Sequence, residues 1–138
     1  MTLNVEYIYN PNNTDLSKNV LVFVHGYRCS GKIWTTNNNI INKAVLSGYR
    51  TAIVELNPSD NIVSNGSMLT AQLREILIKY DVDKTVLICH CKGGIDVQSA
   101  IYHNNADTYI QSVITLSSPH WGTPIADIVF NNYVKQIK

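Results

Sequence analysis

The feature that most constrains the fold is the stretch VLICHCKGG at residues 86–94, an apolar run that leads directly into two glycines. A short continuous apolar run bounded by a turn signal is typical of a strand buried on both faces of a sheet. The two glycines and the residues after them predict a helix that begins within one turn of this strand. A strand followed so closely by a helix is one half of a crossover unit of an α/β fold.

The rest of the chain repeats this alternation of strand and helix. Hydrophobic patterning predicts strands at residues 5–9, 20–24, 51–56, 85–89 and 113–116, and helices at 34–46, 67–80, 93–102 and 125–133. The segments 10–18 and 58–66 are expected to be loops, since they are rich in Asn, Pro, Ser and Gly. The sequence therefore predicts one α/β domain over residues 1–138, with a mostly parallel sheet covered by helices.

Composition excludes several classes of protein. The 138 residues are 45% hydrophobic, which is enough for one domain with a core. The net charge is +1 and no two basic residues are adjacent, so nucleic acid is not an expected partner. No apolar stretch approaches the ~20 residues that span a bilayer. The first residues lack the features of a signal peptide, so we expect a cytoplasmic protein.

Cys91 occupies the predicted turn between strand and helix. The spacing is that of the G-x-S-x-G turn, with Cys91 in place of serine and Cys89 in place of the first glycine. A residue in such a turn exposes its side chain, and the helix behind it offers free N–H groups and positive potential. This environment favours a thiolate and stabilises the oxyanion of an acyl-transfer intermediate.

Three segments together resemble bacterial lipases of the α/β-hydrolase fold. VLVFVHGY at residues 20–27 resembles the strand and His-Gly turn that holds the oxyanion hole, and CHCKGG at residues 89–94 resembles the G-H-S-K-G-G elbow. The segment TLSSPHWGTP at residues 115–124, followed by Ala126 and Asp127, resembles the T-x-x-x-P-H-x-G-[ST]-x-x-A-D pattern of these lipases. Order and spacing agree over roughly residues 20–127.

The resemblance implies a role for each matching residue. Cys91 takes the place of the nucleophile, and the backbone N–H groups of Lys92 and Tyr27 take the place of the oxyanion donors. His25 is expected to hold the oxyanion loop by hydrogen bonding. The acid and histidine of the triad follow later strands in this fold, so we expect a domain truncated after the strand that follows the elbow. His120 is the candidate base within the chain, although its counterpart in these lipases is structural.

Three functions remain open at this stage. The first is a lipase- or esterase-like carboxylic ester hydrolase that acts on an acyl ester or lipid through an acyl-enzyme at Cys91. The second is a catalytically silent module that associates through its open sheet edge with a partner or with another copy of itself. The third is a Cys-dependent acyltransferase, because the G-x-C-x-G-G elbow is similar to that of polyhydroxyalkanoate synthases and thiolate is a good leaving group.

Other polar and aromatic residues receive structural interpretations. Cys89 and Cys91 are too close in sequence to form a typical zinc pair with His90 and Cys29, so no metal is expected, and three cysteines do not indicate a disulfide framework. No dinucleotide or phosphate-binding motif is present, so no cofactor is expected. We expect Asp96 to be a surface charge that favours the helix dipole. Trp34 and Trp121 are expected to pack in the core or at its rim.

Overall fold

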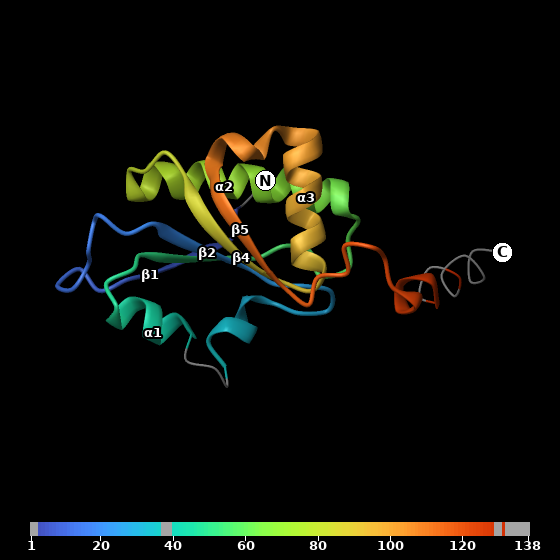
Figure 1. Ribbon diagram of the computed structural model, residues 1–138, viewed down its shortest axis with the longest axis horizontal. Coiled ribbons are helices and arrows are strands. Elements are labelled where there is room, and N and C mark those ends of the chain that lie inside the picture. The colour runs from blue at the N-terminus through green and yellow to red at the C-terminus, as the bar shows by residue number, and fades with distance from the viewer. Residues whose placement is uncertain (1–2, 37–39, 129–130, 132–138) are drawn as a thin grey trace.

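In the part of the chain that the structure describes, the sheet has five strands and is mostly parallel, as predicted. The computed structural model describes residues 3–36, 40–128 and 131 (Figure 1). The strands are β1 (Val5–Ile8), β2 (Val20–Val24), β3 (Thr51–Val54), β4 (Thr85–His90) and β5 (Ile110–Leu116). Their order in the sheet is β1-β3-β2-β4-β5, with β1 antiparallel to β3 and every other pair parallel. The α/β fold class expected from the sequence is confirmed.

Helices cover both faces of this sheet. They are η1 (Gly31–Trp34), α1 (Ile40–Leu46), α2 (Ile62–Tyr80), α3 (Lys92–Asn104) and η2 (Ala106–Tyr109). Figure 1 shows α2 and α3 on one face and α1 on the other. In the part of the chain that the structure describes, no helix is both long enough and apolar enough to cross a membrane.

Alternation along the strands produces two hydrophobic clusters. Val22 and Leu87 point to the α2 and α3 face and belong to the larger cluster. Phe23 and Ile53 point to the opposite face, where Trp34 of η1 and residues of α1 cover them. This alternation follows from the two-residue period of a strand, and it gives the central strands a buried residue at almost every position.

Helix α2 begins at Ile62, five residues before its predicted start. Asn61 caps it, because its side-chain oxygen accepts a hydrogen bond from the Ser64 N–H at 2.9 Å. Gly66, which suggested a loop, lies inside the helix where α3 crosses it. A Cβ on Gly66 would lie 2.8 Å from the backbone nitrogen of Ala100, so close packing of the two helices explains the glycine.

The predicted helix over residues 34–46 is wrong at residues 34–36, which are not α-helical. Only residues 40–46 form α1; Gly31–Trp34 is a separate 3-10 turn, and residues 37–39 lie outside the described residues. The backbone N–H of Gly31 donates to Glu55 Oε1 at 2.5 Å, which fixes this turn against the end of β3. Of the helix expected over 125–133, residues 125–128 and 131 are helical and the others lie outside the described residues; the helical segment begins one residue earlier, at 124.

Candidate active site

Cys91 lies between β4 and α3 in a strained backbone conformation. Its φ is 52° and its ψ is −128°, a combination that residues with a side chain seldom adopt. The Cys91 N–H donates to the carbonyl oxygen of Leu116 at 2.9 Å, and the Cys91 carbonyl accepts from the Gly94 N–H at 3.2 Å. The turn is therefore fixed both to the end of β5 and to the first turn of α3. Strain of this kind persists where the surrounding structure imposes it, and it is concentrated at functional sites.

The turn after β2 lies directly against this elbow. A Cβ on Gly26 would lie 2.7 Å from the Cβ of Cys91 and 3.1 Å from the backbone nitrogen of Lys92. Tyr27 is the next residue, so its N–H and that of Lys92 both lie beside the contact. Neither N–H has a hydrogen-bond acceptor within the described residues. An oxyanion hole requires two donors that converge on one point, so the oxyanion role of the Lys92 and Tyr27 N–H groups stays a prediction.

His25 is buried and holds the turn in place. Its Nε2 accepts a hydrogen bond from the Leu56 N–H at 2.9 Å, and its Nδ1 lies 3.0 Å from the carbonyl oxygen of Gly26. Because a backbone N–H can only donate and a carbonyl can only accept, these contacts assign the neutral tautomer with the proton on Nδ1. Both nitrogens thus contact the backbone, and Nε2 also lies 3.4 Å from Glu55 Oε2. The two backbone contacts agree with the loop-holding role expected for this residue.

Asp96 is buried, so the expectation of a surface charge is wrong. The residue is 2% exposed, because α2 packs over the first turn of α3. One carboxylate oxygen accepts from Lys92 Nζ at 2.7 Å, and the other accepts from Asn65 Nδ2 at 3.3 Å. Burial raises the pKa of the Asp96 carboxyl, while the Lys92 ammonium and the Asn65 amide oppose that rise. The four-residue spacing of Lys92 and Asp96 was a sequence signal for their ion pair on one helix face. No local pattern indicated that Asn65 would bind Asp96.

The three cysteines are free thiols in different environments. Cys89 is fully buried, and burial raises the pKa of its thiol to about 12, with a further contribution from the Asp96 carboxylate. Cys89 therefore remains protonated at neutral pH. Cys29 and Cys91 are half-buried. The described residues contain no group of three or more His, Cys, Asp or Glu side chains placed to hold a metal ion.

His120 follows β5 and is exposed. Its Nε2 lies 3.1 Å from Thr115 Oγ1, and its backbone N–H donates to the carbonyl oxygen of Ser118 at 3.0 Å. The structure gives its ring no hydrogen bond to Cys91. A base role for His120 therefore stays a prediction, and it requires the ring to leave Thr115.

The two tryptophans have different environments. Trp34 is 4% exposed, with its ring 5.1 Å from that of Phe23 and edge-on to His90 at 6.5 Å between centroids. Trp121 is fully exposed, so the expectation that it packs in or beside the core is wrong. It lies beyond β5, in a segment that extends away from the sheet (Figure 1).

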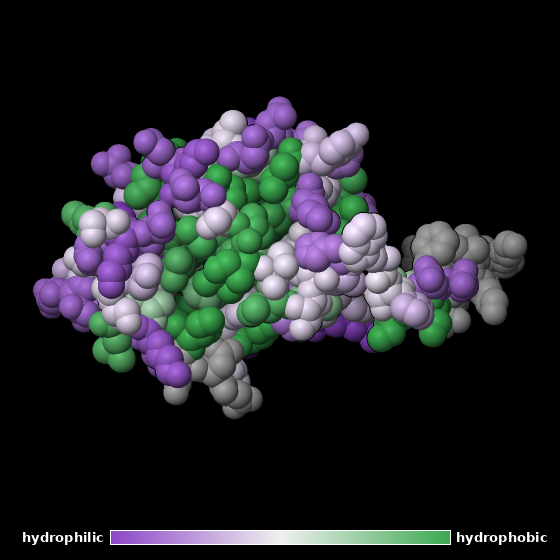
Figure 2. Space-filling view, in the orientation of Figure 1, coloured by the Kyte–Doolittle hydropathy of each residue, from purple (hydrophilic) through white to green (hydrophobic). Residues whose placement is uncertain are grey.

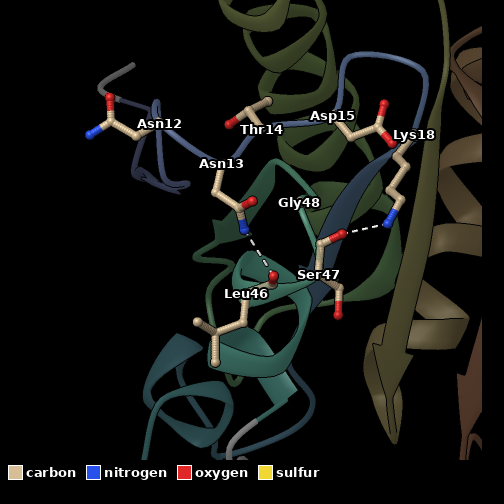
Figure 3. A pocket seen from close by; sticks show the side chains of 8 residues that line it. All are labelled: Asn12, Asn13, Thr14, Asp15, Lys18, Leu46, Ser47 and Gly48. Atoms are coloured by element: carbon tan, nitrogen blue, oxygen red, sulfur yellow. Dashed lines mark hydrogen bonds between the residues drawn. The ribbon is translucent and has the colours of Figure 1, made fainter.

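A polar hollow lies at the other end of the sheet (Figure 3). Asn12, Asn13, Thr14, Asp15, Lys18, Leu46, Ser47 and Gly48 line it. Asn13 donates to the carbonyl oxygen of Leu46 at 2.9 Å, and the Lys18 ammonium donates to that of Ser47. The hollow adjoins the amino ends of β2 and β3, whereas Cys91 follows the carboxyl end of β4. It is therefore separate from the elbow.

Comparison with known proteins gives matches among solved structures. No protein-family model and no curated protein sequence matches the chain. The crystal structure of Bacillus licheniformis lipase BlEst2 in mature form is 38% identical, with a TM-score of 0.87 over 94% of this chain and 53% of that chain. The propeptide form of that lipase is also 38% identical, with a TM-score of 0.85 over 92% and 28%. MenH from S. aureus, at 23% identity and a TM-score of 0.63 over 97% and 49%, shares the fold.

These likenesses and the strand–elbow–helix geometry define the class of protein: the chain has the α/β-hydrolase fold. Within that fold, it is similar to a bacterial lipase, as the sequence motifs implied. The chain spans about half the length of the mature lipase, 53%.

Proposed function

We propose that this chain carries the nucleophile of a lipase- or esterase-like carboxylic ester hydrolase, and that Cys91 is that nucleophile. The observation that supports this most is the left-handed φ of Cys91, held between a parallel strand and a helix. Similarity to a Bacillus lipase at 38% identity supports ester hydrolysis as the reaction class. The proposed substrate is an acyl ester or a lipid.

The proposed reaction proceeds through a thioester. The Cys91 thiolate attacks the ester carbonyl carbon, a C–S bond forms, and the carbonyl electron pair moves to oxygen. The N–H groups of Lys92 and Tyr27 donate to that oxyanion. Its collapse breaks the C–O bond, and the leaving alcohol takes the proton that came from the thiol. Water then attacks the thioester, which releases the acid and restores the thiol.

His120 is the candidate to accept and return this proton within the described chain. It lies beyond the carboxyl end of β5, the strand hydrogen-bonded to β4 ahead of the elbow. An alcohol in place of water in the second step would make the same thioester an acyl donor, which is the acyltransferase alternative.

Intact-mass analysis after brief exposure to p-nitrophenyl acetate tests the proposal. We expect one acetyl group on Cys91 of the parent and none on Cys89, which is buried and protonated. The Cys91→Ala variant should lack the acetyl group at residue 91. An adduct that turns over in the parent but persists in His120→Ala supports the base role. If the adduct persists in both the parent and His120→Ala, deacylation depends on groups outside these residues. Labelling equal to that of Cys91→Ala rejects the enzyme proposal for this chain.

A second candidate function is self-association through β5, which we propose from the composition of that strand. β5 ends the strand order, and its sequence IQSVITL contains neither charge nor proline, the usual protection of an edge strand. Ile114 is 51% exposed and Leu116 is 42% exposed. Figure 2 shows hydrophobic residues gathered over the sheet on this side of the molecule. With a net charge of only +1, two copies repel one another weakly.

Light scattering during size-exclusion chromatography tests this second candidate. We expect a dimer whose population falls with dilution, and a monomer for Leu116→Lys. The matched control is Ile78→Lys, which changes an exposed isoleucine on α2 and should leave the dimer intact. A parent that is monomeric at every concentration contradicts self-association.

A further inference from the structure

We propose that Asn65 is a positioning residue that fixes the two candidate oxyanion donors, the backbone N–H groups of Lys92 and Tyr27, relative to each other. The inference rests on the proposed function, because it assigns a purpose to the Lys92 and Tyr27 N–H groups. Asn65 lies near the start of α2 and is 1% exposed. Its amide nitrogen donates to two acceptors, Asp96 Oδ2 at 3.3 Å and the carbonyl oxygen of Asn57 at 2.9 Å.

The first of these bonds leads to the elbow. Asp96 Oδ1 accepts from the Lys92 ammonium at 2.7 Å, so one carboxylate joins Asn65 to the residue that directly follows Cys91. All three side chains lie where α2 packs on the first turn of α3. Asn65 thereby ties α2 to the turn that presents the Lys92 N–H.

The second bond leads to the loop after β2. Asn57 and Pro58 are consecutive, and the Pro58 carbonyl oxygen accepts from the Arg28 N–H at 3.1 Å. Arg28 directly follows Tyr27 and has a φ of 55°, a conformation that the surrounding contacts must impose. The peptide that Asn65 binds is therefore next to the one that holds the Tyr27–Arg28 turn. The Asn65 side chain therefore connects, through Asp96 on one side and Asn57 on the other, the two segments that carry the candidate donors.

The energetics of Asn65 also favour a positioning role. Its Oδ1 is buried and has no hydrogen-bond partner among the described residues, which is an unfavourable state for an amide oxygen. Both neighbours of its nitrogen are acceptors, so a flipped amide would place oxygen against oxygen. The side chain thus leaves one polar atom unsatisfied while its nitrogen holds two loops, a cost that pure core packing does not require.

Comparing two reactions of Cys91 tests the inference. Acylation by p-nitrophenyl acetate develops an oxyanion, whereas alkylation by iodoacetamide displaces iodide at a saturated carbon and needs only the thiolate. We expect Asn65→Ala to lower the ratio of acylation rate to alkylation rate by about 10–100-fold, since small displacements of donors have effects of this size. The control is Asn61→Ala, which removes the α2 cap without touching the network and should leave the ratio unchanged. An unchanged ratio in Asn65→Ala overturns the inference.

Two further measurements keep the test decisive. If Asn65→Ala does not fold, Asp96→Asn keeps the side-chain shape while weakening the Lys92 contact, and it must lower the same ratio. If the parent is not acylated at all, the proposed function fails but the coupling is still testable. In that case hydrogen exchange of the Arg28 amide must be faster in Asn65→Ala than in Asn61→Ala, and equal exchange rates reject the role of Asn65.

Discussion

A Gly93→Ala substitution will lower the free energy of unfolding by about 3 kcal/mol. The added Cβ would lie 2.5 Å from the carbonyl oxygen of His25 and 2.9 Å from that of Val24. Both are backbone atoms at the end of β2, so no side-chain rotation can relieve the overlap. The ~1 kcal/mol that alanine gains over glycine in a helix is smaller than this clash. Urea denaturation followed by circular dichroism measures the effect.

The control for this prediction is Gly122→Ala. Apart from its two chain neighbours, no atom of the described residues lies within 4 Å of a Cβ built on Gly122, and its φ of 82° gives alanine backbone strain without a collision. We expect a loss of about 1 kcal/mol there. Equal losses at the two glycines would contradict the claim that contact between β2 and α3 limits the size of residue 93.

A Cys91→Gly substitution should abolish acylation and still make the protein more stable than Cys91→Ala. Both variants lack the thiol, and they differ only in the Cβ that is held at φ 52° and ψ −128°. Glycine adopts these angles without strain, which favours it by about 1–3 kcal/mol. The larger backbone entropy of glycine in the unfolded chain offsets about 0.5–1 kcal/mol of that. We expect a net difference of about 1–2 kcal/mol in urea denaturation.

This pair of variants separates strain from chemistry. Acyl labelling should be absent from both, whereas only the glycine variant should gain stability. If Cys91→Gly is the less stable of the two, the elbow is not strained and its conformation is no argument for function.

Local sequence patterns were enough to predict the α/β class, the mostly parallel sheet and the position of Cys91 between a strand and a helix. Residues 20–24 and 86–89 are nearly uninterrupted apolar runs, and such runs identify central strands because burial on both faces leaves no polar positions. The glycines at 93 and 94 located the start of the helix. These features are local, so a pattern of neighbouring residues is enough to predict them.

The identity of the polar residues buried around the elbow could not be predicted, because it depends on how distant elements pack. Asn65 and Asp96 are 31 positions apart and meet only because α2 crosses α3 at Gly66. The glycine inside α2 and the burial of Asp96 follow from the same crossing. A hydrogen bond between distant elements leaves no periodic trace along the chain, because periodicity records which face is buried and not which residue lies opposite it.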